Sequence, residues 1–270
     1  MGNEKLLDIK NLSVTYKTED GIVYAVNDLN MEIGHKETLG FVGETGAGKT
    51  TTAMTIMGLL PTPPGKVTSG EILFDGRDML TISDKERRSI LGEEISMIFQ
   101  DPMTSLNPSM RVGDQIVEMI RLHKKIGKKE AMVEAENLLE MVGIRRERAR
   151  SYPHQFSGGM KQRVGIARAY CSDPDVLLMD EPFGHLDAQT RYMMQEALEQ
   201  IWQSEKRTVV FVTNNIEEAL YLADRIILMT DCPSRIKEEY HIQLPRPRNL
   251  VDEEFLRLRK EITERMNSKD

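Results

Sequence analysis

The chain has 270 residues, 40% hydrophobic and 29% charged, which allows one large domain or two modest ones, each with a core of its own. The formal net charge of −7 argues against a protein that binds nucleic acid through general phosphate attraction. No apolar run is long enough to cross a bilayer, and two cysteines are too few for a disulfide framework, which favours a reducing cytoplasm.

The first 33 residues have the alternating pattern of strands. Apolar residues alternate over 7–16, a polar break follows at 18–21, and the pattern resumes at 23–26. We expect an antiparallel β subdomain here. An apolar strand at 38–42 then leads into a glycine-rich segment and a helix-forming run over 51–60, which we expect the following prolines to end.

The glycine-rich segment, GETGAGKT, matches the complete pattern G-x-x-x-x-G-K-[ST] between a strand and a helix. Its glycines let backbone N–H groups surround a phosphate, and the helix N-terminus adds the positive end of its dipole. Lys49 is placed to reach the β- and γ-phosphates, and Thr50 to bind Mg²⁺. The sequence therefore predicts a nucleoside triphosphate site made by Gly43, Glu44, Thr45, Gly46, Ala47, Gly48, Lys49, Thr50 and Thr51.

The middle of the chain changes from strands to helices. A short buried strand at 95–99 delivers Gln100, and helical periodicity follows over 112–142. Four apolar residues share one helix face, and Gly143 is a natural stop; the four are Ala131, Ala135, Leu138 and Val142. We therefore expect a helical insert at about 101–155.

Strands and helices alternate again after the insert. Apolar strands at 176–179, 208–212 and 226–229 are separated by helical patterns at 188–203 and 216–223. Apolar strands between helices predict an α/β protein, with a parallel sheet covered by helices on both faces. An extended hinge at 244–248 and a charged helix at 252–266 come last, so we expect a domain over 1–244 and a C-terminal segment over 245–270.

Two further motifs carry chemistry. The apolar strand 176–179 runs into Asp180 and Glu181, a Walker B pattern in which Asp180 would hold Mg²⁺ and Glu181 would orient or deprotonate the attacking water. The segment FSGGM at 156–160 opens a helix and makes a second anion-binding helix end. A chain with one phosphate loop does not need two anion-binding helix ends in the same nucleotide site. We therefore expect a head-to-tail dimer, in which the second helix end of each chain covers the nucleotide of the other chain.

These motifs, in this order, resemble the nucleotide-binding subunit of an ATP-binding-cassette (ABC) transporter of the importer type, along nearly the whole chain. The resemblance implies a P-loop NTPase fold with a RecA-like parallel core. Tyr16 would stack on adenine, Gln100 would sense the γ-phosphate and Mg²⁺, and Ser157, Gly158 and Gly159 would close the partner's nucleotide.

The same resemblance implies the cofactors and partners. It implies ATP and Mg²⁺, membrane-embedded permease subunits docked on the helical insert, and a second ABC subunit, identical or related. An extracytoplasmic solute-binding protein would act indirectly, and no nucleic acid is expected. The chain would lie on the cytoplasmic face of the cell membrane as a peripheral protein.

Two groups of importers share features with the chain. Residues 97–108 and 152–160 resemble di- and oligopeptide importers, whereas 180–191 and the ending at 244–248 resemble nitrate, sulfonate and taurine importers. The length suits the second group, and the cysteine-bearing C-terminal extension of the peptide group is absent. We therefore expect the second group, although the membrane and solute-binding subunits set the solute.

One position departs from the family. Where the family has Thr-His after the strand 208–212, this chain has Thr213-Asn214, and an amide cannot carry a positive charge or shuttle a proton. Three alternatives follow from this departure. The chain is a degenerate or regulatory ATP-binding subunit with slow or no turnover, or it is an ATPase in which Asn214 is sufficient for hydrolysis. In the third alternative it is an ATPase in which His185, acting on the site of the partner chain, replaces the missing histidine.

Overall fold

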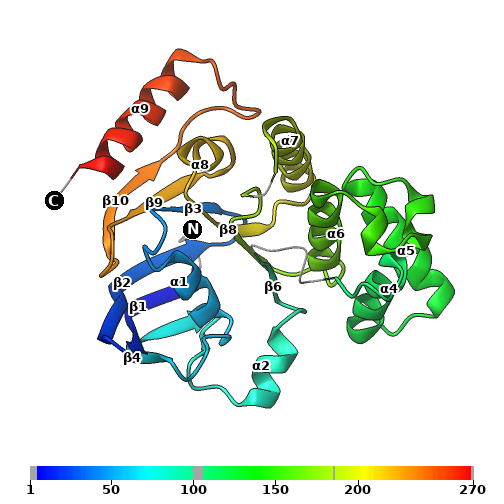
Figure 1. Cartoon of the computed structure of the whole chain (residues 1–270), viewed down its shortest axis with the longest axis horizontal. Coiled ribbons are helices and arrows are strands. Elements are labelled where there is room, and N and C mark those ends of the chain that lie inside the picture. Colours follow the sequence, from blue (N-terminus) through cyan, green and yellow to red (C-terminus); the bar gives the residue numbers. More distant parts are fainter. Residues whose placement is uncertain (1–4, 100–105, 185, 269–270) are drawn as a thin grey trace. The chain divides into compact units, whose positions relative to one another are not determined.

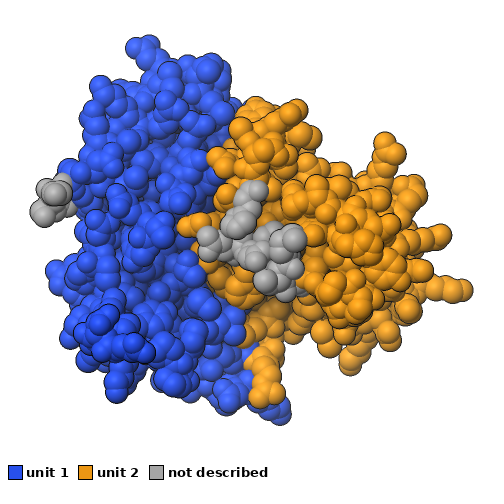
Figure 2. Space-filling view, in the orientation of Figure 1, with its two compact units in different colours: residues 1–87, 208–270 blue, residues 88–207 orange. Residues whose placement is uncertain are grey.

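The computed structural model describes residues 5–99, 106–184 and 186–268. The chain forms two compact units, residues 1–87 with 208–270 and residues 88–207 (Figure 2). The predicted boundary at residue 244, the helical insert at 101–155 and the separate C-terminal segment remain a prediction.

The N-terminal part of the first unit is an antiparallel sheet in the order β2-β1-β4-β5 (Figure 1). Strands β1 (Lys5–Thr18) and β2 (Gly21–Gly34) pair along most of their length, and β4 (Gly65–Phe74) pairs with the other side of β1. The two-residue β5 (Arg77–Asp78) closes the sheet. The antiparallel subdomain expected from the alternating pattern is therefore present.

The second sheet of this unit is parallel at its centre. Strand β3 (Thr38–Val42) lies between β8 (Thr208–Thr213) and β9 (Arg225–Met229), parallel to both, and all residues of the three strands are buried. Continuous burial explains their unbroken apolar sequences. Strand β10 (Ile236–His241) adds an antiparallel edge to β9, and the sequence patterns gave no prediction of it.

Three helices belong wholly to the first unit. Helix α1 (Lys49–Ile56) follows the glycine-rich segment, α8 (Ile216–Leu222) follows β8, and α9 (Glu253–Asn267) ends the chain. The expectation that α1 continues to residue 60 was wrong. Gly58 has φ = 64°, a left-handed conformation that stops a helix, so α1 ends at Ile56, five residues before Pro61. Helix α2 (Asp84–Ile90) contains the boundary between the units.

The second unit combines two strands with helices. Strand β6 (Ile95–Ile98) pairs in parallel with β7 (Val176–Asp180), and α4 (Val112–His123), α5 (Lys128–Met141) and α6 (Gly158–Tyr170) contact one another (Figure 1). Two short 3₁₀ turns, Arg146–Arg150 and Pro153–Gln155, precede α6, and α7 (Ala188–Glu205) follows β7. The helical character expected between 112 and 142 is confirmed.

Details of burial in the second unit refine the sequence expectations. Ala131, Ala135 and Val142 are buried as expected, but the leucine that completes this face is Leu139, whereas Leu138 is half-buried. Cys171 is buried at the end of α6, and burial raises the pKa of its thiol to about 11, while Cys232 of the first unit is exposed; both are free thiols. Among the described helices none is both long and apolar enough to cross a membrane.

Candidate functional site: a phosphate-binding loop and its supports

The phosphate loop, residues 43–50, connects β3 to α1 in the first unit. Gly48 has φ = 68° and is the N-cap of α1, and Gly46 has φ = 90°. A Cβ atom at Gly48 would lie 2.3 Å from the carbonyl oxygen of Ala25. This position therefore requires glycine for two reasons, its positive φ and the lack of space for a side chain. The loop thus lies directly against the backbone of β2.

The side chain of Lys49 lies inside this loop. Its ammonium donates hydrogen bonds to the carbonyl oxygens of Gly43 and Glu44, each at 2.7 Å, and only 4% of the residue is exposed. A buried ammonium is costly unless oxygen atoms surround it. The loop therefore holds a positive charge at its centre, and this charge favours an anion bound there.

Two more predicted residues stand next to the loop. The Tyr16 hydroxyl lies 3.3 Å from Oγ1 of Thr51, so the tyrosine of β1 is anchored at the first turn of α1. Thr50 is exposed at the same helix start. These contacts bring Tyr16, Lys49, Thr50 and Thr51 together within one unit.

Asn214 lies at the neighbouring strand end. In the parallel pair β3–β8, Val42 is opposite Thr213. The residue after Val42 is Gly43, where the phosphate loop starts, and the residue after Thr213 is Asn214. Asn214 is exposed. Parallel strands end at one edge of a sheet, which is where ligands bind in open α/β sheets. The structure therefore puts Asn214 at the same edge as Gly43.

The turn that carries Asn214 is held by a buried carboxylate. Thr213 donates to Glu218 at 2.6 Å, the Asn215 backbone N–H donates to the Thr213 hydroxyl at 3.0 Å, and Asn215 caps α8 by accepting from Glu217 N–H at 2.9 Å. Glu218 is only 4% exposed. Sequence reasoning did not single out this network, because its members are ordinary capping residues until the strand end places them together.

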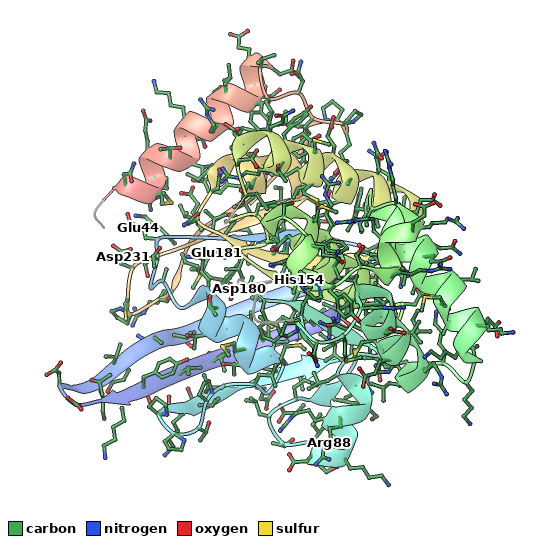
Figure 3. The ribbon with its side chains drawn as sticks, turned by 45° about the vertical axis from the view of Figure 1, so that its right-hand side comes forward. Glu44, Arg88, His154, Asp180, Glu181 and Asp231 are labelled. Carbon is green, nitrogen blue, oxygen red and sulfur yellow. The ribbon has the colours of Figure 1, made fainter. Side chains whose placement is uncertain are left out.

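The acidic pair of the second unit stands at the end of β7 (Figure 3). Asp180 is 3% exposed and closes the strand, and Glu181 is half-buried with φ = 43°. A left-handed backbone at a residue other than glycine costs on the order of 1–3 kcal/mol and is typical of functional positions. The backbone N–H of Gly184 donates to the Glu181 carbonyl at 3.1 Å and closes this turn.

The segment 156–160 forms the start of α6. Ser157 is the N-cap and accepts a hydrogen bond from the backbone N–H of Met160 at 3.3 Å, while Gly158 is exposed. A Cβ atom at Gly159 would lie 2.6 Å from the Thr190 side chain of α7, so a larger residue does not fit there. Phe156 is buried under the guanidinium of Arg148, which lies 4.7 Å from its ring centre. The helix N-terminus is thus open to solvent and rigidly supported.

The candidate residues therefore fall into two groups. One group of the first unit surrounds the phosphate loop, namely Tyr16, residues 43–51 and Asn214. The other belongs to the second unit, namely Asp180, Glu181, Ser157, Gly158 and Gly159. Gln100, for which the resemblance implied a nucleotide sensor, and His185, the hypothetical compensating group, lie outside the described residues.

The residues of the loop fit a phosphate chain and a magnesium ion. Nothing would lie within 4 Å of a Cβ at Gly46, so the loop presents its backbone to open space there. Lys49 carries a positive charge, and the exposed Thr50 hydroxyl offers an oxygen of the kind that Mg²⁺ prefers. The donor set therefore agrees with Mg²⁺ and a nucleoside triphosphate.

The order of strand, phosphate loop and helix, beside parallel strands, defines the class of the protein as a P-loop NTPase. A solved structure agrees with this class. It is the dimeric ATP-binding cassette MJ0796 in a post-hydrolysis state bound to ADP and Pi. The two folds match with a TM-score of 0.78 at 28% sequence identity, over 88% of this chain and 99% of that chain. A family model described as ABC transporter matches residues 26–184. The chain belongs to the ABC transporter family.

Curated relatives share this membership. The chain is 43% identical to an oligopeptide transport ATP-binding protein, OppD, of Bacillus subtilis over 83% of this chain and 63% of the relative. It is 45% identical to a dipeptide transport ATP-binding protein, DppD, of the same organism over 84% of this chain and 68% of the relative. The chain thus spans about two thirds of the length of these relatives.

Substitution of the loop glycines tests this geometry. Gly48→Ala and Gly46→Ala both place alanine at a positive φ, but only at Gly48 does the new Cβ meet backbone. We expect Gly48→Ala to cost about 1–3 kcal/mol more in free energy of unfolding than Gly46→Ala, the usual cost of overpacking. Urea denaturation measures both; equal losses of stability would contradict the close contact between the loop and β2.

Proposed function

We propose that this chain is the ATP-binding and ATP-hydrolysing subunit of a peptide importer. The observation that carries the proposal is the phosphate loop with Lys49 buried inside it, joined to the family membership of the chain. The two relatives described above are named for peptide transport, which favours the first of the two resemblances. The expectation of a nitrate, sulfonate or taurine importer finds no support among them.

In this proposal each group acts on one MgATP. The backbone of the loop and Lys49 bind the phosphates, Tyr16 binds the base, and Thr50, Asp180 and Gln100 hold the metal. Bound Mg²⁺ neutralises charge that develops on the phosphate oxygens. Glu181 orients the attacking water and takes up its proton, and the Asn214 amide donates a hydrogen bond to the γ-phosphate.

We propose further that two subunits act head to tail. The solvent-open N-terminus of α6, with Ser157 and Gly158 exposed, supports this arrangement because helix N-termini bind anions. The related cassette described above is dimeric. In the dimer, Ser157, Gly158 and Gly159 of each chain would close the nucleotide of the other. The second subunit is this chain again or a relative of it.

The helical insert is the proposed docking site for permease subunits, at the cytoplasmic face of the membrane. A groove of about 610 Å³ in the second unit supports this, because it combines charged and apolar lining residues, among them Arg111, Asp114, Val117 and Leu122. Leu122 of this groove is 71% exposed. The solute-binding protein would contact only the permease.

Glu181→Gln tests the proposed hydrolysis. The substitution keeps the shape of the side chain and removes its basicity, so we expect turnover of ATP to fall at least about a hundredfold while MgATP affinity stays within a factor of about two. Steady-state phosphate release, with and without permease subunits, and calorimetric titration measure the two quantities. Glu253→Gln, on the exposed first turn of α9 and outside the helical insert, is the matched control.

Two outcomes would count against the proposed hydrolysis. If Glu181→Gln turns over at the rate of the unsubstituted chain, Glu181 is not the base. If both proteins are equally inactive with every permease pairing, the chain is not an ATPase.

Asn214 favours a second candidate function, an ATP-binding subunit with slow turnover. Asn214 lies exposed at the sheet edge beside the phosphate loop, where an imidazole would add a positive charge and a proton carrier. Loss of one well-placed catalytic contact costs on the order of 2.7–4 kcal/mol in the transition state. The comparisons add no support for this second candidate.

Substitution of Asn214 distinguishes the two candidates. If Asn214 limits the rate, Asn214→His raises kcat about tenfold or more, and Asn214→Ala lowers it, with MgATP affinity little changed. The measurement is kcat for the three proteins under saturating ATP. Equal kcat values would exclude Asn214 from the reaction and with it the slow-turnover candidate.

A further inference from the structure

The phosphate loop has a contact far along the chain that none of its motifs predicts. Ser234 is fully buried, and its hydroxyl donates a hydrogen bond to the carbonyl oxygen of Ala47 in the middle of the loop. Ser234 belongs to the turn 230–235 between β9 and β10. Figure 3 labels a residue on each side of this contact, Glu44 of the loop and Asp231 of the turn.

This hydrogen bond determines which way the loop backbone points. The peptide bond between Ala47 and Gly48 is trans, so its carbonyl and its N–H point in opposite directions. With the Ala47 carbonyl directed at Ser234, the N–H of Gly48 is directed away from the turn. Backbone N–H groups of such a loop are the ones that bind phosphate.

The turn itself is tied at several points. Inside it, the Thr230 backbone N–H donates to the Arg235 carbonyl and the Arg235 N–H donates to the Thr230 hydroxyl, both at 2.9 Å. Outward, the carbonyl of Ser234 accepts from the N–H of Asn27 at 2.9 Å, and Ser234 forms a parallel bridge with Val26 of β2. Ser234 therefore has little freedom to move with the loop.

The turn 230–235 also contacts β2, which pairs with the strand that carries Tyr16, the proposed adenine-binding residue. The thiol of Cys232 lies 3.0 Å from the Tyr24 carbonyl, and Tyr24 follows Val23, which is paired with Tyr16. One short turn thus touches β2 near the proposed adenine side and the loop at the phosphate side.

We propose that Ser234 is a positioning residue that holds the phosphate loop in its anion-binding conformation through the Ala47 carbonyl. This role rests on the proposed function, since it concerns binding of the phosphate part of ATP. Without the hydroxyl, the peptide between Ala47 and Gly48 loses its external anchor. Binding of the phosphates must then also order this peptide, so affinity for phosphate falls and affinity for the base does not.

Ser234→Ala and two partial ligands test the proposal by calorimetric titration. We expect the dissociation constants of MgATP and of inorganic pyrophosphate to rise about tenfold, equivalent to about 1.4 kcal/mol, and that of adenosine to stay within a factor of about two. Ser69→Ala is the matched control, because the Ser69 hydroxyl also donates to a backbone carbonyl, that of Asn11 at 3.1 Å, away from the phosphate loop. A Ser234→Cys variant keeps the side-chain volume with a weaker donor and serves if Ser234→Ala does not fold.

The outcomes separate this proposal from the proposed function. If the unsubstituted chain does not bind MgATP, the proposed function fails first. If it binds and the variant binds MgATP and pyrophosphate equally well, Ser234 does not position the loop. Equal weakening of adenosine and pyrophosphate would make Ser234 a general structural residue and would also overturn the proposal.

Discussion

The interaction on which the first unit depends most is that of the Lys49 ammonium with the carbonyl oxygens of Gly43 and Glu44. It draws the loop around a buried positive charge, which stabilises the loop best when an anion is also present. The neighbouring elements serve this arrangement. β2 and Ser234 support the loop from outside, Tyr16 contacts the helix that follows it, and β8 brings Asn214 to the same sheet edge.

Backbone strain and burial in the second unit also indicate a ligand site. Glu181 keeps a left-handed backbone directly after a buried strand, and the Ser157 helix start is open although Gly159 and Phe156 behind it are packed. Strained backbone of this kind clusters at active sites and ligand-binding segments. In the proposed function both features have a use, Glu181 as the base for the attacking water and the Ser157 helix start as the lid over the nucleotide of a second subunit.

Much of this could be predicted from the sequence, because the motifs are contiguous and short-range rules govern them. The phosphate loop, the acidic pair after β7 and the Ser157 cap are each set by a few neighbouring residues. The contact between Ser234 and Ala47 joins residues 187 positions apart, and no periodicity or motif marks it. The early end of α1 depended on the conformation of Gly58, which the nearby prolines obscured, and β10 depended on pairing with β9.

The central claim is that the charge held in the phosphate loop binds the phosphates of ATP. Calorimetric titration of MgATP into the unsubstituted chain and into Lys49→Met tests it most directly. The account predicts saturable binding with one site per chain and a loss of about tenfold or more in affinity for the variant, as expected for a hydrogen bond to a charged group. Equal affinity of the two proteins, or no binding to the unsubstituted chain, would contradict it.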